Sequence, residues 1–220
     1  MPKKRKKKIR RVWPNLRIFC EGEKTEPNYI NSYIDSKLPG NKTLRVVVVE
    51  KTDKTTPLQL VEEAIAKKDS YLTPDGDIFW VVFDRESVAK YKDELHAKAQ
   101  ALAKENGIKI ALSNVCFELW LLLHLCDSAP PKSKCDEVIS QTQFKKELRL
   151  RGVADYKKGS KELYSFLANA ICDARKRAKM MNARTRKGAE KGKSNPYQLN
   201  PYTDVHLLLD AIDSFGRKRC

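Results

Sequence analysis

Four short apolar runs, each followed by a segment with helical spacing, constrain the fold of this chain more than any other feature. The runs lie at residues 16–20, 44–50, 78–83 and 108–112 and are rich in aliphatic and aromatic residues. Continuous apolar runs of this length are typical of strands buried on both faces of a sheet. Because a parallel crossover is usually made by a helix, the pattern predicts an α/β fold, with a parallel sheet of about four strands flanked by helices.

The segments between these runs carry helix-start and helix-stop signals. Thr56 precedes Pro57, which places a good N-cap residue before a residue suited to the first helical turn. Thr25 is the corresponding N-cap candidate after the first run. A further helix is expected over about 87–106, ended by Gly107 at the position that favours glycine.

The character of the chain changes after about residue 127. The segment SAPPKSK reads as a linker, and the sequence beyond it has apolar residues at helical spacing and no strand pattern. We therefore predict a basic N-terminal arm over residues 1–14, an α/β core over 15–126 and an α-helical C-terminal extension over 127–220. Within that extension, a basic loop is expected at about 184–196.

The net charge of +16 indicates a polyanionic partner. The chain has 44 basic and 28 acidic residues, and much of the surplus lies at residues 3–11 and 175–193. Nucleic acid is the commonest partner of such a protein, with a ribosome or a membrane surface as alternatives, and each basic run can also be a solvated arm. The first run is no secretory signal, because Val12, Trp13 and Pro14 follow it in place of a long apolar stretch.

Cysteine usage and hydropathy both suggest a cytoplasmic protein. The six cysteines form no C-x-x-C pair and have no flanking histidines at zinc spacing, so we expect reduced thiols. No apolar run approaches the roughly 20 residues that a membrane helix needs, and we expect no membrane association through a spanning segment.

Acidic side chains follow three of the four predicted strands. Glu21 comes directly after the first strand and precedes Gly22, Asp84 and Glu86 end the third, and Glu118 lies beyond the fourth. Ligands of open parallel sheets bind beyond the carboxyl ends of the strands. Like charges gathered there repel unless their pKa values rise or a divalent cation holds them, and oxygen ligands suit Mg²⁺ or Mn²⁺. We predict that Glu21, Asp84 and Glu86 bind this metal.

Each of these acids also has a purely structural interpretation. Asp84 can cap the helix that follows, and Glu86 can lie in the first turn of that helix, where the helix dipole favours an acid. Glu23 and Glu26 read as solvated acids of a first helical turn. Glu118 lies in an apolar segment, where a carboxylate needs a partner, and it is a candidate catalytic residue.

Several basic and amide side chains are candidates for contacting a phosphate. A lysine does so as a point charge, and the basic blocks add affinity that does not depend on sequence and that falls with salt. The candidates are Lys24, Asn114, Lys157, Lys158, Arg184, Arg186 and Lys187.

The order of four motifs resembles that of the RloB-like family. The motifs are FCEGEKTEPNYI, WVVFDRES, SNVCFELWLLLH and NPYTDVHLLLDAI, and the resemblance covers nearly the whole chain after the first dozen residues. The family is assigned to the Toprim superfamily, whose fold occurs in topoisomerases, primases and certain phage-defence nucleases. The resemblance implies a Toprim-like sheet, in which Glu21-Gly22 and Asp84-Arg85-Glu86 match the Glu-Gly and Asp-x-Asp strand ends, with glutamate where the second aspartate is usual.

The resemblance also implies a function. Family members are typically encoded beside an ATPase, RloA, in restriction or anti-phage loci, which suggests a metal-dependent nuclease acting on RNA, such as tRNA, or on DNA under control of that partner. Glu21 then serves as a metal ligand or as the general base. The alternatives are a non-catalytic nucleic-acid-binding or adaptor subunit, another Toprim chemistry, or a phosphatase with Asp84 as nucleophile.

Overall fold

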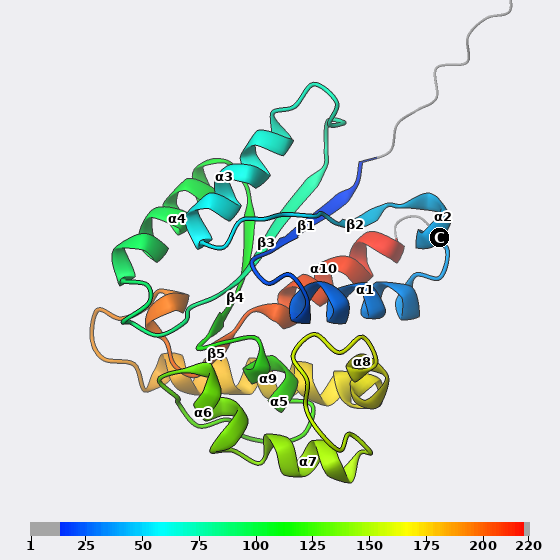
Figure 1. The fold of residues 1–220 in the computed structure, drawn as a ribbon. Coiled ribbons are helices and arrows are strands. Elements are labelled where there is room, and N and C mark those ends of the chain that lie inside the picture. Colours follow the sequence, from blue (N-terminus) through cyan, green and yellow to red (C-terminus); the bar gives the residue numbers. More distant parts are fainter. Residues whose placement is uncertain (1–13, 218–220) are drawn as a thin grey trace, which may run out of the picture.

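The computed structural model describes residues 14–217, which form a five-stranded sheet with helices on both faces (Figure 1). The strand order is β2-β1-β3-β4-β5, in which the first four strands are parallel and β5 runs antiparallel to β4. The prediction of a mostly parallel α/β sheet is confirmed. The strands are β1 (Leu16–Cys20), β2 (Val47–Val49), β3 (Ile78–Asp84), β4 (Lys109–Asn114) and β5 (Tyr202–Thr203).

Two of the helix signals read from the sequence are visible in the structure, whereas the prediction of Thr25 as an N-cap is wrong, because Thr25 is the first residue of its helix and Lys24 is the N-cap. The hydroxyl of Thr56 accepts a hydrogen bond from the backbone N–H of Gln59, as an N-cap does. Gly107 has a φ of 67° just after the helix before β4, a left-handed conformation that glycine adopts without strain. The helices are α1 (Thr25–Lys37), α2 (Asn41–Leu44), α3 (Pro57–Lys68), α4 (Asp93–Glu105), α5 (Glu118–Leu122), α6 (Cys135–Ser140), α7 (Phe144–Leu150), α8 (Leu163–Leu167), α9 (Ile171–Lys187) and α10 (Val205–Arg217), with the 3-10 turns η1 (Ala168–Ala170) and η2 (Pro196–Gln198).

The strand registers bring the carboxyl ends of three strands to one edge. Cys20 at the end of β1 pairs with Val82 of β3, and Asp84 at the end of β3 pairs with Ser113 of β4. The backbone N–H of Glu21 donates to the carbonyl of Val82 at 2.9 Å, so the ladder continues one residue beyond β1. The side chains that follow these strands are therefore held by paired backbone.

The two faces of the sheet are covered by different helices. Helices α3 and α4 pack on one face, where Leu60 and Ala99 lie in a cluster with Phe79 of β3. Helices α1 and α10 cover the other face, where Ile30 and Leu208 belong to a larger cluster that also takes in α5 and α9 (Figure 1). The sheet is thus buried on both sides, as its apolar strands require.

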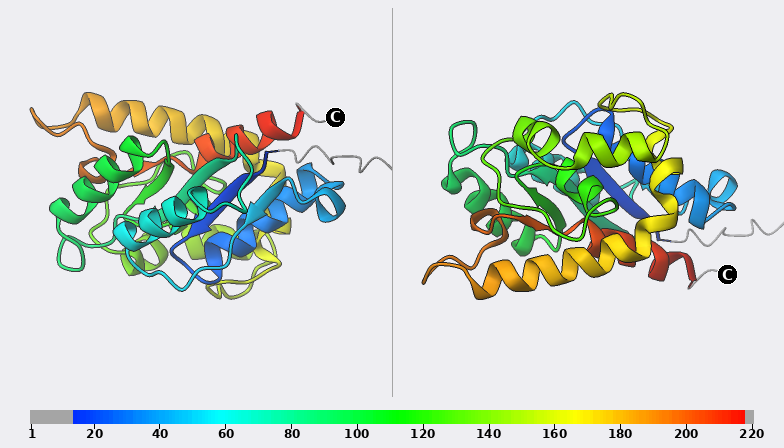
Figure 2. Two further views of the ribbon diagram at one scale, coloured as in Figure 1. Left: turned by 90° about the horizontal axis from the view of Figure 1, so that it is seen from above. Right: turned by 90° about the horizontal axis from the view of Figure 1, so that it is seen from below.

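The C-terminal third joins the same core. The long helix α9 runs beside α10 along one side of the molecule (Figure 2), and α5, α6 and α7 lie beyond the carboxyl ends of the strands. The prediction of no strand after residue 127 is wrong, because β5 pairs with β4 over two residues. The side chain of Asn182 in α9 accepts a hydrogen bond from the backbone N–H of Thr203 and donates one to its carbonyl. These bonds satisfy backbone groups on the edge of β5 that does not pair with β4.

Three further predictions can be compared with the structure. The predicted basic loop starts later than expected, because α9 continues to Lys187. The expectation of reduced thiols is wrong for Cys116 and Cys135, which form a disulfide with a Cα–Cα distance of 5.5 Å. The predicted arm over residues 1–14 lies almost entirely outside the described residues. Among the helices of residues 14–217, none is long and apolar enough to cross a membrane.

Candidate active site

A cleft of about 470 Å³ opens at the carboxyl ends of β1 and β3. It brings together all four acids predicted to form the site, together with one from the turn before α1 and one from the first turn of that helix. Three lysines lie on the same walls. The carboxyl groups belong to Glu21, Glu23, Glu26, Asp84, Glu86 and Glu118, and the lysines are Lys24, Lys90 and Lys158.

Glu21 is held against the end of β3. Its Oε2 accepts a hydrogen bond from the backbone N–H of Asp84 at 3.1 Å, and the hydroxyl of Tyr91 lies 3.4 Å from Oε1. Burial raises the pKa of Glu21 to about 7, against the opposing effects of the Asp84 N–H and of Lys90. Near neutral pH this carboxyl group can therefore hold or release a proton.

Asp84 lies at the centre of the acidic side chains. Burial raises its pKa well above the ordinary value, and the carboxylates of Glu26 and Glu118 raise it further. The helix-cap interpretation of Asp84 is wrong, because the next helix, α4, begins only at Asp93 with Lys92 as its N-cap. The first-turn interpretation of Glu86 is wrong for the same reason.

Glu26 is the residue that sequence reasoning misjudged. It was expected to be a solvated acid, but it is 7% exposed and lies in the cleft, where burial raises its pKa to about 7 and Glu118 adds to the shift. A Cβ atom at Gly22 would overlap a carboxyl oxygen of Glu26, so a larger residue there would displace the end of this side chain, which folds back over the turn. The sequence did contain a signal for this position, which is Gly22. A glycine turn directly after a strand starts the next helix at the edge of the sheet, and an acid in the first turn of that helix then lies at the same edge.

Glu86 and Arg85 point to different surroundings. Glu86 has a φ of 58°, which is uncommon for a residue with a side chain, and its Oε1 accepts a hydrogen bond from Lys90 at 2.6 Å. Arg85 is 3% exposed and donates to the carbonyl groups of Tyr91 and Tyr197 at 2.7 and 3.0 Å. The alternation along Asp84-Arg85-Glu86 thus sends two acids into the cleft and the intervening base into the protein.

Glu118 is 2% exposed and takes its partners from a segment distant in sequence. Its Oε1 accepts from the hydroxyl of Tyr156 at 2.9 Å and lies 3.4 Å from Nζ of Lys158. Its Oε2 lies 3.0 Å from Sγ of Cys135. The expectation that this carboxylate needs a partner is met by residues whose proximity no local pattern indicated.

Of the predicted phosphate-binding residues, two line the cleft and the others lie elsewhere. Lys24 and Lys158 line the cleft, whereas the exposed Lys157 lines a separate hollow beside Tyr156. Asn114 is buried, and its Nδ2 donates to the carbonyl of Leu199 at 2.8 Å, so it holds the segment before β5. It also lines a neighbouring cavity of about 520 Å³.

The three predicted residues of the second basic block lie on the last turn of α9, outside the walls of the cleft. Arg186 bonds the hydroxyl of Tyr202 and lies 4.9 Å from the centre of that ring. Arg184 lines a shallow hollow beside Pro201. The exposed Lys187 completes this basic turn.

The donor set of the cleft fits a hard divalent cation. Carboxylate oxygens from β1, β3, α1 and α5 face one volume, and the crowding around Asp84 is relieved by a cation or by protons. Oxygen-rich sites of this kind are those that Mg²⁺ and Mn²⁺ occupy. Glu21, Asp84, Glu86 and Glu26 line this cleft. Among residues 14–217, no three of these carboxylates have oxygens within 4.8 Å of one another, so a shared cation would require their side chains to move closer together.

The chain was compared with known proteins. A family model described as RloB-like protein matches residues 16–212, a range that contains every acid of the cleft. No match was found among curated proteins or among solved structures.

Proposed function

This chain belongs to the RloB-like protein family, and on that premise we propose that it is a metal-dependent nuclease with a Toprim-like fold. The substrate is RNA, such as tRNA, or DNA, and the reaction is hydrolysis of a phosphodiester bond. The observation that carries the proposal is the gathering of Glu21, Glu26, Asp84 and Glu118 in one cleft whose walls also carry lysines. An acid cluster with raised pKa values in a chain of net charge +16 suits a cation and a polyanion together.

The carboxylates of the cleft have different roles in this proposal. Asp84, Glu86 and Glu21 supply the oxygen ligands, and a bound Mg²⁺ or Mn²⁺ supplies charge neutralisation at the scissile phosphate and a lower pKa for the attacking water. Glu21 is either a ligand or the base that accepts the proton of that water, since its carboxyl group lies beside Asp84 and has a pKa of about 7. Glu118 lies at the other wall, where it orients side chains from the C-terminal third.

The lysines of the cleft wall contact the substrate. Lys24 and Lys158 are both exposed and line the cleft, so each can reach a phosphate at its opening. Lys90 pairs with Glu86 at 2.6 Å, and its ammonium group would be free to contact a phosphate if Glu86 bound a cation. The basic blocks add affinity that falls with salt.

We also propose that an RloA-type ATPase controls this activity in anti-phage defence. The support is the family membership, because the family's genes typically lie beside that ATPase. A non-catalytic nucleic-acid-binding or adaptor subunit of the same complex is the alternative. Nuclease activity distinguishes the two functions, because an adaptor subunit cleaves no nucleic acid.

A cleavage panel tests the proposal. The protein is incubated with tRNA, single-stranded DNA and duplex DNA, with Mg²⁺, Mn²⁺ or EDTA, alone and with the ATPase and ATP. We expect metal-dependent cleavage of one substrate class, its loss in Asp84→Ala, and its retention in Glu62→Gln, an exposed acid of α3 that serves as the matched control. Equal cutting by wild type and Asp84→Ala, or no cutting under any condition, would leave the adaptor function as the better explanation.

A further inference from the structure

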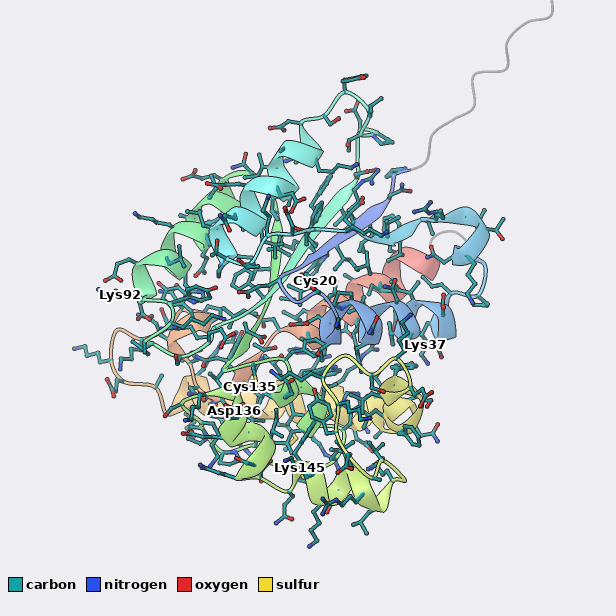
Figure 3. The ribbon with its side chains drawn as sticks, in the orientation of Figure 1. Cys20, Lys37, Lys92, Cys135, Asp136 and Lys145 are labelled. Carbon is teal, nitrogen blue, oxygen red and sulfur yellow. A yellow bond between two sulfur atoms is a disulfide. The ribbon has the colours of Figure 1, made fainter. Side chains whose placement is uncertain are left out.

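A second cluster of possible metal ligands lies against the wall of the acidic cleft. Cys116 follows β4, Glu118 begins α5 and Cys135 begins α6, and one ligand atom from each lies within 4.8 Å of the other two. Cys116 is 1% exposed and Glu118 2%, whereas Cys135 is partly exposed and gives access to the cluster. Figure 3 labels Cys135 at the start of α6, below the ends of the strands. In chemistry this cluster differs from the cleft, since two of its three donors are sulfur.

The surroundings of Glu118 orient its carboxyl group toward the sulfur atoms. Tyr156 and Lys158 both lie against Oε1, at 2.9 and 3.4 Å. This leaves Oε2 facing Cys135, whose Sγ is 3.0 Å away. A carboxylate that binds a metal through one oxygen usually has an outer partner that is hydrogen-bonded to its other oxygen.

The charges of the cluster balance around a divalent cation. Two thiolates and one carboxylate carry three negative charges, and Nζ of Lys158 lies 3.7 Å from Sγ of Cys135. With a divalent cation and this ammonium group, the net charge is zero. Soft thiolate ligands select zinc over magnesium, so the two sulfur donors distinguish this cluster from the all-oxygen cleft with which it shares Glu118.

We propose that Cys116, Cys135 and Glu118 form a zinc site when the two cysteines are reduced. Zinc at about 2.3 Å from each of two sulfurs in tetrahedral geometry holds these sulfurs about 3.8 Å apart. The Cα–Cα distance of 5.5 Å accommodates that separation through rotation of the side chains. Three protein ligands leave the fourth position of the zinc to water.

The disulfide of the structure is the oxidised form of the same pair of side chains. Disulfide and zinc exclude each other, because a disulfide sulfur carries no thiolate charge. The inference goes beyond the proposed nuclease and does not depend on it. It concerns a different metal, and its test measures no cleavage.

Cobalt binding tests the site directly. The full chain is reduced, freed of reductant under nitrogen and titrated with Co²⁺ in excess Mg²⁺, which occupies oxygen sites. We expect one Co²⁺ per chain with a sulfur-to-cobalt absorption band in the near ultraviolet and the visible bands of a tetrahedral site, all displaced by Zn²⁺. Protein oxidised with diamide should show none of these bands.

Variants locate the ligands. Cys135→Ser should weaken Co²⁺ binding and lower the sulfur-to-cobalt band to half or less, because it removes one of the two thiolates. Tyr156→Phe should weaken Co²⁺ binding by about 10-fold, as expected for an outer partner of a ligand. Cys172→Ser replaces an exposed free cysteine and is the matched control, with an unchanged spectrum expected. Circular dichroism checks that each variant is folded.

A measurement on the wild type keeps the test independent of folding in the variants. Zn²⁺, but not Mg²⁺, should slow alkylation of Cys135 in the reduced chain and leave alkylation of Cys172 unchanged, as followed by mass spectrometry. The proposal is overturned if reduced wild type shows no sulfur-to-cobalt band, if the band is as intense in Cys135→Ser as in wild type, or if Zn²⁺ gives Cys135 no protection.

Discussion

The consecutive residues Asp84, Arg85 and Glu86 have two contrasting electrostatic environments, one around the base and one around the two acids. Arg85 is buried, and its guanidinium group meets two backbone carbonyls and the carboxylate of Asp93 at 2.7 Å. Asp84 and Glu86, on either side of it, face a cleft in which burial and then the other acids raise the pKa of Asp84. The positive charge is matched within the protein, and the negative charges are left in excess.

This is the difference expected between a charge that supports the fold and charges that serve a binding or catalytic site. A buried charge that supports the fold is paired and fully hydrogen-bonded, because an unpaired one destabilises the protein. A group of like charges with shifted pKa values lowers stability, and in a cleft it is typical of a binding or catalytic site. Four predictions test the contrast, ordered by the size of the expected change in stability.

The largest change is expected for Arg85→Met. The substitution leaves the carbonyl of Tyr197 and the carboxylate of Asp93 without their donor, which should lower the free energy of unfolding by about 3 kcal/mol. Urea denaturation measures it. Lys98→Met, at an exposed position of α4, is the control and should change stability by less than about 0.5 kcal/mol. Equal effects of the two substitutions would mean that Arg85 is no structural anchor.

The next effect concerns the close approach of Gly22 and Glu26. Gly22→Ala places a Cβ atom in the volume of the Glu26 carboxyl group, and the free energy of unfolding should fall by about 1.5 kcal/mol, toward the lower end of overpacking effects because the end of this side chain can move. In the double variant Gly22→Ala/Glu26→Ala the overlap is gone, so most of the loss should be recovered. Additive effects in a double-mutant cycle would contradict the contact.

Asp84→Asn should change stability in the opposite direction to Arg85→Met. Without metal near pH 8, removing the ionisable group at the centre of the acids should raise the free energy of unfolding by about 1 kcal/mol, while cleavage is lost, as is common where a site trades stability for function. Thermal and urea unfolding in EDTA provide the measurement. A destabilised Asp84→Asn would show that Asp84 supports the fold as Arg85 does.

The smallest effect is the pH dependence of stabilisation by Mg²⁺. Glu21 and Glu26 have a pKa of about 7 in the folded chain, above the ordinary 4.5. Since the folded pKa is raised, the stability linked to these groups is complete below about pH 4.5 and is lost as the pH rises through about 7. Mg²⁺ should restore it, raising the melting temperature by about 3 °C near pH 8 and by less than about 1 °C near pH 5.5.

The comparison with and without Mg²⁺ at each pH isolates the carboxyl groups from other titrating residues. Buried His96, whose pKa burial lowers to about 4, titrates in both samples and cancels from the difference. In Glu26→Gln the pH dependence of the Mg²⁺ effect should become weaker. An Mg²⁺ effect that is equal near pH 5.5 and pH 8 would count against a cation in this cleft.

Much of the fold follows from patterns that are local in the chain. The apolar run of β3, the N-cap of Thr56 and the turn at Gly107 each depend on neighbouring residues, and all three are seen in the structure. The convergence of Glu21 and Asp84 also followed, because parallel strands end at the same edge of a sheet. These are consequences of backbone geometry, which the sequence alone is sufficient to predict.

The tertiary structure decided whatever depends on partners far away in the chain. Strand β5 has two residues and exists through its pairing with β4, and Glu118 takes its partners from Tyr156 and Lys158. The pairing of Cys116 with Cys135 and the burial of Glu26 likewise arise only once separate segments pack together. The sequence by itself therefore determined which edge of the sheet carries the acids. Packing determined which of them are buried and how they are paired, because burial and pairing depend on atoms contributed by the whole chain.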